Sequence, residues 1–361
     1  MQKHRIFAFL VIQGLLLLAS PSQAQFQNGN QSTLLTLPLI SQRAVTVQRV
    51  GVTDITITYH RPLVNGRQVW GAMVPYGQVW RAGANQNTTI EFTDPVTVEG
   101  KPLEKGIYGL HMIPGEASWT VIFAKASTAW GSFTYDQAED ALRVTVKPQT
   151  TDFYEALTYD FDQLKPDSTV VTLKWEKVAV PFQVAVNVNE IAQQSIKKQL
   201  RGLAQYTWDG WNDAATYVLE TKGKPEEALR YVDRSIQNEE RFENLETKSR
   251  ILAALGKKEE SKTALDTALD KGNAIQVHVY ARGLQAQKRQ DEALEIFRKN
   301  AKKNPDHWVI HSGLARIASA QGDFAGAIKE LKLAQAGAPD QQKPQIDGLI
   351  KRLEAKQDIN K

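Results

Sequence analysis

The sequence predicts a two-domain fold, with an N-terminal antiparallel β-sandwich or jelly roll and a C-terminal α-helical solenoid. Apolar and polar residues alternate through most of residues 43–188, as in strands with one buried face. After Asn189 the apolar period becomes helical, and a segment of similar sequence recurs four times. The chain of 361 residues is long enough for two domains of ordinary size.

The first residues are typical of a signal peptide. Lys3 and Arg5 form a basic end, and an apolar run from Ile6 to Ala19 follows. This run of about 14 residues is short for a membrane-spanning helix, which needs roughly 20. The small residues of Ser22-Gln23-Ala24 favour cleavage after Ala24. We therefore expect loss of residues 1–24 and export to the periplasm or the extracellular space, without a transmembrane segment in the mature chain.

The composition is that of a soluble globular protein. Hydrophobic residues make up 42% of the chain and charged residues 23%, which disfavours disorder and a membrane bundle. The net charge of +4 comes from mixed signs and gives no argument for nucleic-acid binding. The absence of cysteine excludes a disulfide framework, a thiolate metal site and a lipid anchor on an N-terminal cysteine. We expect a soluble protein that is not a lipoprotein and does not bind nucleic acid.

Residues 25–187 are predicted to form the β domain. Three strands show a clear apolar face, formed by Ile55, Ile57 and Tyr59, by Leu142, Val144 and Val146, and by Val171, Leu173 and Trp175. Residues 107–113 and 118–124 are predicted to form a hairpin, because Pro114 and Gly115 between them favour a turn. Roughly eight to ten short strands with no helical pattern between them indicate a sandwich or jelly roll.

Residues 188–361 are predicted to form the helical domain. The small residues Ala228, Ser261, Ala293 and Ala327 are separated by 33, 32 and 34 positions. This spacing of helix, turn and second helix resembles the tetratricopeptide repeat. The resemblance implies a groove that binds a protein partner. The alternative is a solenoid that only packs on the β domain or forms a dimer.

A loop at residues 60–87, here called the arginine loop, separates two of the predicted strands. Loops of this length are uncommon in compact domains and are often functional. Residues 55–90 contain no Asp or Glu. The predicted ligand-binding residues of this segment are Arg61, Arg67, Arg81, Asn85, Trp70 and Trp80. Because guanidinium groups beside apolar walls suit a carboxylate or phosphate, we expect an anionic small molecule or glycan as the ligand.

A purely structural role for the arginine loop is the alternative. Glu155 falls on the otherwise apolar face of its predicted strand, and a buried carboxylate needs a partner. Arg81 would serve as that partner. The loop would then be a plug held in place by arginine side chains.

The β domain resembles a secreted bacterial family known only as a domain of unknown function. The resemblance rests on R-P, G-R, W-G, V-P-Y and W-R-A-G-A-N between Tyr59 and Phe92, followed by V-E-G, G-I-Y-G-L and W-T-V-I-F. It covers roughly residues 38–180, and it implies export from a bacterial cell and a β-rich fold. Members of this family often carry helical repeats after the sheet domain. The resemblance implies no activity and no catalytic residue.

A hydrolase of the cell envelope is the alternative function. His60 and His111 are the only histidines of the predicted β domain, and with a carboxylate they would form an acid/base or metal set. No H-x-H or H-E-x-x-H spacing fixes such a geometry, so we assign no catalytic residue, no metal ligand and no cofactor.

Carbohydrate binding without a catalysed reaction is favoured over hydrolysis. Trp130 is the better surface candidate for that role, and Trp119 is expected in the core.

Overall fold

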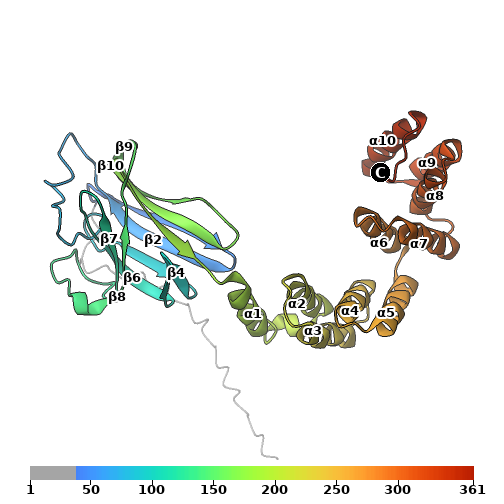
Figure 1. Cartoon of the computed structure of the whole chain (residues 1–361), viewed down its shortest axis with the longest axis horizontal. Helices are drawn as coiled ribbons and strands as arrows, with labels where there is room; N and C mark the ends of the chain where they lie inside the picture. The colour runs from blue at the N-terminus through green and yellow to red at the C-terminus, as the bar shows by residue number, and fades with distance from the viewer. Residues whose placement is uncertain (1–37) are drawn as a thin grey trace, which may run out of the picture. The chain divides into compact units, whose positions relative to one another are not determined.

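The computed structural model describes residues 38–361, and the predicted signal peptide lies outside the described residues. The chain divides into two compact units, one that ends at Val188 and one that spans Asn189–Lys361. The first unit is built from strands and the second from helices (Figure 1). Within residues 38–361, no helix has the length and apolar character that a membrane crossing requires.

The described β region contains two sheets in which all paired strands run antiparallel. The six-stranded sheet has the order β1-β2-β3-β6-β7-β8. Its strands are β1 (Gln42–Val50), β2 (Thr53–Arg61), β3 (Thr89–Phe92), β6 (Gly106–Ile113), β7 (Trp119–Ala124) and β8 (Asp140–Val146). The four-stranded sheet has the order β5-β4-β10-β9. Its strands are β5 (Lys101–Leu103), β4 (Val96–Val98), β10 (Ser168–Ala185) and β9 (Gln149–Asp162).

The two sheets pack face to face through the apolar side chains that alternate along their strands. Tyr59 of β2 meets Tyr159 of β9 with ring centroids 4.8 Å apart. Phe123 of β7 meets Phe182 of β10 at 5.8 Å, and all four of these rings are buried. The predicted hairpin is confirmed, because β6 and β7 pair directly across residues 114–118. Trp119 is confirmed as a core residue and is 2% exposed.

The second unit consists of helices that pair in chain order, α2 with α3, α4 with α5, α6 with α7 and α8 with α9. The ten α-helices of the described chain are α1 (Val188–Gln199), α2 (Trp208–Glu220), α3 (Pro225–Asn238), α4 (Phe242–Ala254), α5 (Lys258–Lys271), α6 (Ala274–Ala286), α7 (Gln290–Lys303), α8 (Trp308–Ala320), α9 (Phe324–Gly337) and α10 (Lys343–Glu354). A short 3-10 helix, η3 (Asp340–Gln342), precedes α10.

The small residues of the repeat lie where the helices approach one another. Ala228, Ala293 and Ala327 are fully buried, and each belongs to an apolar cluster between neighbouring helices. Ser261 differs because it is partly buried and its hydroxyl donates to the Ser249 carbonyl at 2.8 Å. The predicted fold class is therefore confirmed: an antiparallel β region at residues 42–185 precedes a solenoid of tetratricopeptide-like helix pairs.

Candidate functional site

The first two residues of the arginine loop, His60 and Arg61, belong to β2, and residues 62–88 contain no regular strand or helix. Isolated backbone bridges hold it to the sheets, from Leu63 to Ala156 of β9 and from Trp80 to Met112 of β6. Its two tryptophans belong to an aromatic cluster rather than to an open cleft. Trp70 contacts Trp119 at 4.9 Å and Trp175 at 5.6 Å between ring centroids, and Trp80 stacks on Trp175 at 6.0 Å.

The W-R-A-G-A-N segment has a conformation that its residues explain. Ala82 adopts a left-handed φ of 51°, and its carbonyl accepts hydrogen bonds from the hydroxyls of Thr88 at 3.2 Å and Tyr159 at 2.9 Å. A Cβ on Gly83 would lie 2.5 Å from the Thr88 hydroxyl oxygen, so only glycine fits there. The Trp80 indole N–H donates to the Gly83 carbonyl at 3.1 Å. These contacts give most of the signature a role in folding.

Three of the predicted ligand-binding residues use their side chains to hold the loop. Arg61 donates to the Leu157 carbonyl at 2.9 Å and to the Thr158 hydroxyl at 2.7 Å. Arg67 donates to the carbonyls of Val64 and Leu63 at 3.0 and 2.5 Å. Asn85 donates to the Ser41 carbonyl at 3.1 Å. Arg61, Arg67 and Asn85 therefore hold the loop, whereas the buried Arg81 Nε and Trp70 Nε1 have no hydrogen-bond partner among residues 38–361.

The structure does not pair Arg81 with Glu155. Glu155 is exposed and accepts the backbone N–H of Asn65 at 2.8 Å. Among residues 38–361, no carboxylate lies within salt-bridge distance of Arg81, and its buried Nε has no hydrogen-bond partner. Burial lowers the pKa of this guanidinium from its ordinary value. The Trp130 ring centroid lies 6.0 Å from the Arg81 Cζ.

Trp130 is confirmed as a surface residue. It is 55% exposed and stacks on Phe133, which is 79% exposed, at 6.1 Å between ring centroids. Gly131 between them has a left-handed φ of 72°, and a Cβ at this glycine would lie 3.4 Å from Arg81 Nη1. An exposed aromatic pair thus borders an arginine that has no acidic partner within residues 38–361.

His60 and His111 lie on the face of the six-stranded sheet that points away from the other sheet, because side chains alternate along a strand. They belong to β2 and β6, with β3 between these two strands. His60 Nδ1 is buried without a partner, whereas His111 Nδ1 lies 2.9 Å from the Ser132 hydroxyl. Burial and the nearby Arg43 and Arg81 lower the pKa of His60, and burial lowers the pKa of His111 to about 4. Both rings are therefore neutral near pH 7.

The described residues do not supply a ligand set for the metal-assisted form of the hydrolase. No three His, Cys, Asp or Glu side chains gather as a metal site within residues 38–361. The neutral rings of His60 and His111 would need such a third ligand to hold a catalytic metal.

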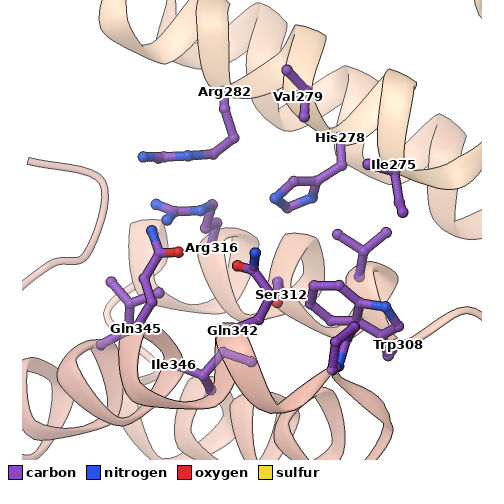
Figure 2. A pocket seen from close by; sticks show the side chains of 13 residues that line it. Ile275, His278, Val279, Arg282, Trp308, Ser312, Arg316, Gln342, Gln345 and Ile346 are labelled. Carbon is purple, nitrogen blue, oxygen red and sulfur yellow. The ribbon is translucent and has the colours of Figure 1, made fainter.

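A second candidate site, here called the solenoid pocket, has a volume of about 390 Å³ and lies between α6, α8 and α10 (Figure 2). It is lined by Ile275, His278, Val279, Arg282, Trp308, Val309, Ser312, Arg316, Pro339, Gln342, Gln345, Ile346 and Leu349. No Asp or Glu lines it, although three basic side chains do. Its volume is at the lower end of the range of roughly 300–1,000 Å³ for ligand sites.

One wall of the solenoid pocket is cationic. The guanidinium groups of Arg282 and Arg316 lie one above the other in Figure 2, with the His278 ring beside them. Arg316 is 4% exposed, and its buried Nε has no hydrogen-bond partner among the residues that the structure describes. Burial, with Arg282 and Arg352 nearby, lowers the pKa of Arg316 to about 9, and Asp358 opposes this. Burial and the two pocket arginines also lower the pKa of His278 to about 3.

The C-terminal residues form hydrogen bonds to Arg316, which lines the cationic wall of the pocket. The Arg316 Nη1 donates to the Ile359 carbonyl at 2.8 Å. The Asn360 side chain accepts from Gln285 of α6 at 2.7 Å and donates to the Arg316 carbonyl of α8 at 2.9 Å. Asp358 accepts from the Ser319 hydroxyl at 2.7 Å and forms no ion pair with Arg316 among the described contacts. The segment 358–360 therefore joins α6 to α8 beside the arginines.

The pocket residues are not among the residues predicted from the sequence, although the repeat carries a usable signal. Arg282 and Arg316 are 34 positions apart, and so are His278 and Ser312. Equivalent positions of successive repeats lie side by side in a solenoid, so a basic residue that recurs at the repeat spacing predicts adjacent cations.

Comparison with known families agrees with this architecture. Residues 41–184 match the family described as "Protein of unknown function (DUF2911)", and residues 284–353 match the tetratricopeptide repeat. The chain thus contains a DUF2911 domain followed by a tetratricopeptide repeat. No curated protein matches the chain.

Several solved structures match part of the chain. YrrB, described as a tetratricopeptide-repeat protein with an unusual peptide-binding site, is 16% identical, with 45% of this chain and 84% of that chain covered and a TM-score of 0.26. MamA is 15% identical, with 44% and 92% covered and a TM-score of 0.29. A tetratricopeptide repeat protein from Parabacteroides merdae is 19% identical, with 46% and 66% covered and a TM-score of 0.30.

Proposed function

We propose that the chain is an exported binding and scaffolding protein whose helical repeats hold a protein partner. Tetratricopeptide repeats indicate protein–protein interaction or scaffolding, and the repeat at residues 284–353 supports this role. The observation that carries the proposal is the solenoid pocket, because it combines a defined volume with exposed apolar side chains. Ile275 and Val279 line it and are 46% and 61% exposed.

Blocking the pocket tests this function. Val279→Arg places a bulky charge in the pocket from an exposed position, so it leaves the fold intact. We expect a partner crosslinked to the wild-type chain in intact cells to be lost with this variant. Leu333→Arg is the matched control, because Leu333 is 45% exposed on α9 and does not line the pocket. Recovery of the same partner with both variants would contradict a role of the pocket.

Export is part of the proposal and rests on the sequence of residues 1–24. N-terminal sequencing of the mature protein tests it directly. We expect the mature chain to begin at Gln25 and to be found in the periplasmic or secreted fraction. Full-length chain in the cytoplasmic fraction would contradict export.

A second binding function in the β domain is favoured by Arg81. Arg81 has no carboxylate partner in the described part of the chain and lies next to the exposed pair Trp130 and Phe133, which suits an anionic small molecule or an acidic glycan. The guanidinium would bind the anion, and the aromatic faces would pack against the rest of the ligand. Arg61, Arg67 and Asn85 then support the loop that carries Arg81.

A thermal-shift screen with anionic metabolites and acidic glycans tests this site, because a ligand that binds the native state raises its apparent stability. We expect a shift with the wild-type chain that is lost in Arg81→Gln. Lys147→Gln is the control, since it removes one positive charge at an exposed position of the same unit. A shift that survives in Arg81→Gln would place the ligand elsewhere.

A further inference from the structure

A row of polar side chains crosses the outward face of the six-stranded sheet. Its members are 6%, 4% and 2% exposed and are His60, Asn87 and His111. Thr89 of β3 pairs with Thr58 of β2 and with Gly109 of β6. Each member of the row lies two positions beyond one of these three paired residues, so all three share one face of the sheet.

Gly109 allows two members of the row to approach each other. A Cβ at this glycine would lie 2.7 Å from Asn87 Nδ2 and 3.1 Å from His111 Nε2. Any larger residue on β6 would therefore displace one of these side chains. The glycine of the G-I-Y-G-L segment thus makes room for polar groups on the outward face.

The loop between β7 and β8 packs against this row. The Asn87 Nδ2 donates to the carbonyls of Ala126 at 3.3 Å and Ser127 at 3.4 Å. The same loop carries Trp130 and Phe133, the exposed aromatic pair beside the arginine loop. The polar row and the aromatic pair therefore belong to one region of the β domain.

Three polar atoms of this region are buried and have no hydrogen-bond partner among residues 38–361. They are Arg81 Nε, Asn87 Oδ1 and His60 Nδ1. Buried atoms of this kind are rare, because each has lost its hydrogen bonds to water. The Nε–H of an arginine can only donate, whereas the oxygen of an amide can only accept. A ligand that satisfies both must therefore carry an acceptor and a donor close together.

We propose that this region binds a hexuronic acid, the sugar that carries the carboxylate of many acidic glycans: the carboxylate bonds to Arg81, and a ring hydroxyl bonds to Asn87 and His60. A hydroxyl can donate to Asn87 Oδ1 and accept from His60 in the tautomer that is protonated at Nδ1. The apolar face of the sugar ring would pack on Trp130. The hexuronate site rests on the proposed binding function of the β domain and adds the chemical class of its ligand.

Charge favours a carboxylate over a phosphate at this site. A carboxylate carries one negative charge, which one guanidinium matches, whereas a phosphate monoester carries about −1.5 to −2 near pH 7. His60 and His111 are neutral near pH 7 and add no positive charge. A dianion beside the partly buried Arg81 would therefore retain an uncompensated negative charge.

Isothermal titration calorimetry with the full chain tests the hexuronate site. The probes are glucuronate, galacturonate and mannuronate. Three kinds of control change one feature each: the matching neutral hexoses lack the charge, cyclohexanecarboxylate lacks the hydroxyls, and glucose 6-phosphate exchanges the carboxylate for a phosphate. We expect at least one hexuronate to bind, and its neutral hexose and cyclohexanecarboxylate to bind at least about tenfold more weakly, as for loss of a charge-assisted or buried hydrogen bond.

His60→Phe separates ligand binding from a structural role. Phenylalanine has a ring of similar size without the unpartnered nitrogen, so we expect a higher melting temperature together with about tenfold weaker hexuronate binding. Thr56→Val is the matched control, because it removes a hydroxyl from the same face of β2 four residues away; hexuronate binding should stay within about twofold of the wild-type value. A lower melting temperature with unchanged hexuronate binding in His60→Phe would assign this histidine to folding and overturn the proposal.

The controls distinguish failure of the hexuronate site from failure of the proposed function. Equal binding of hexuronate and cyclohexanecarboxylate, or tighter binding of glucose 6-phosphate, would overturn the hexuronate site and leave an anion site at Arg81. Equal binding of hexuronate and neutral hexose to both the wild type and Arg81→Gln would overturn both. If no probe binds, the hexuronate site is refuted, and the thermal-shift screen with other anions decides the proposed function separately.

Discussion

The neutral state of His278 makes the helical unit sensitive to acid. Burial, followed by Arg316 and Arg282, lowers the pKa of His278 to about 3, whereas an unfolded histidine titrates near about 6.5. Between these two values the unfolded state binds more protons than the folded state. The free energy of unfolding therefore falls as the pH decreases from about 6.5 towards 3.

The size of the effect follows from the two pKa values. Between about pH 7 and pH 5, protonation of the unfolded histidine should cost about 2 kcal/mol of the free energy of unfolding. The assay is urea denaturation followed by far-ultraviolet circular dichroism, which reports mainly on the helices. His278→Gln carries no titrating ring, so we expect its stability to fall less than that of the wild type over this pH range.

The difference between the two proteins isolates His278 from other groups. Glu246 has a pKa raised mainly by burial, so its contribution has the opposite sign, and it is present in both proteins. An equal loss of stability in wild type and His278→Gln between pH 7 and pH 5 would refute the reasoning. It would mean that the ring is hydrated or protonated in the native pocket.

Three further substitutions test the packing. Trp70→Ala removes contacts with Trp80, Trp119 and Trp175 and should destabilise the β domain by about 3 kcal/mol in urea denaturation; an unchanged midpoint would contradict a structural role of the cluster. Ala327→Leu should cost about 1–3 kcal/mol, because Ala327 is fully buried between helices; a neutral result would indicate a loose interface. Gly348→Ala should instead increase the free energy of unfolding by about 0.5–1 kcal/mol and so raise the melting temperature, since a Cβ there meets open space within α10; a lower melting temperature would contradict this.

The fold class could be predicted from the sequence because apolar or small residues recur at a regular spacing in both domains. The alternation at Ile55, Ile57 and Tyr59 places these residues in the core, and all three are buried. The alanines at the repeat spacing likewise identify helix contacts, as Ala293 and Ala327 show. Such patterns depend only on the spacing of residues along the chain, so they are visible in the sequence.

The hydrogen-bond and ion-pair partners of individual side chains could not be predicted from the sequence in this way. Arg61 and Arg81 look alike in the sequence, yet Arg61 bonds to Leu157 and Thr158 across the sheets and Arg81 has no carboxylate partner among the described residues. The expected partner, Glu155, lies on the exposed part of β9, where the pairing with β10 is irregular. These differences depend on strand register between segments almost a hundred residues apart, which no local pattern specifies.

The tryptophan cluster of the β domain has a spectroscopic consequence. Ring centroids of Trp70, Trp80, Trp119 and Trp175 lie between 4.9 and 6.0 Å apart in the contacts that join them, close enough for their electronic transitions to couple. The native β domain should therefore show a near-ultraviolet circular dichroism signal from these ordered indoles, which weakens when the indoles separate. The helical unit has its own far-ultraviolet signal. Loss of the tryptophan cluster and loss of the helices can thus be compared in one sample, without a dye or a truncation.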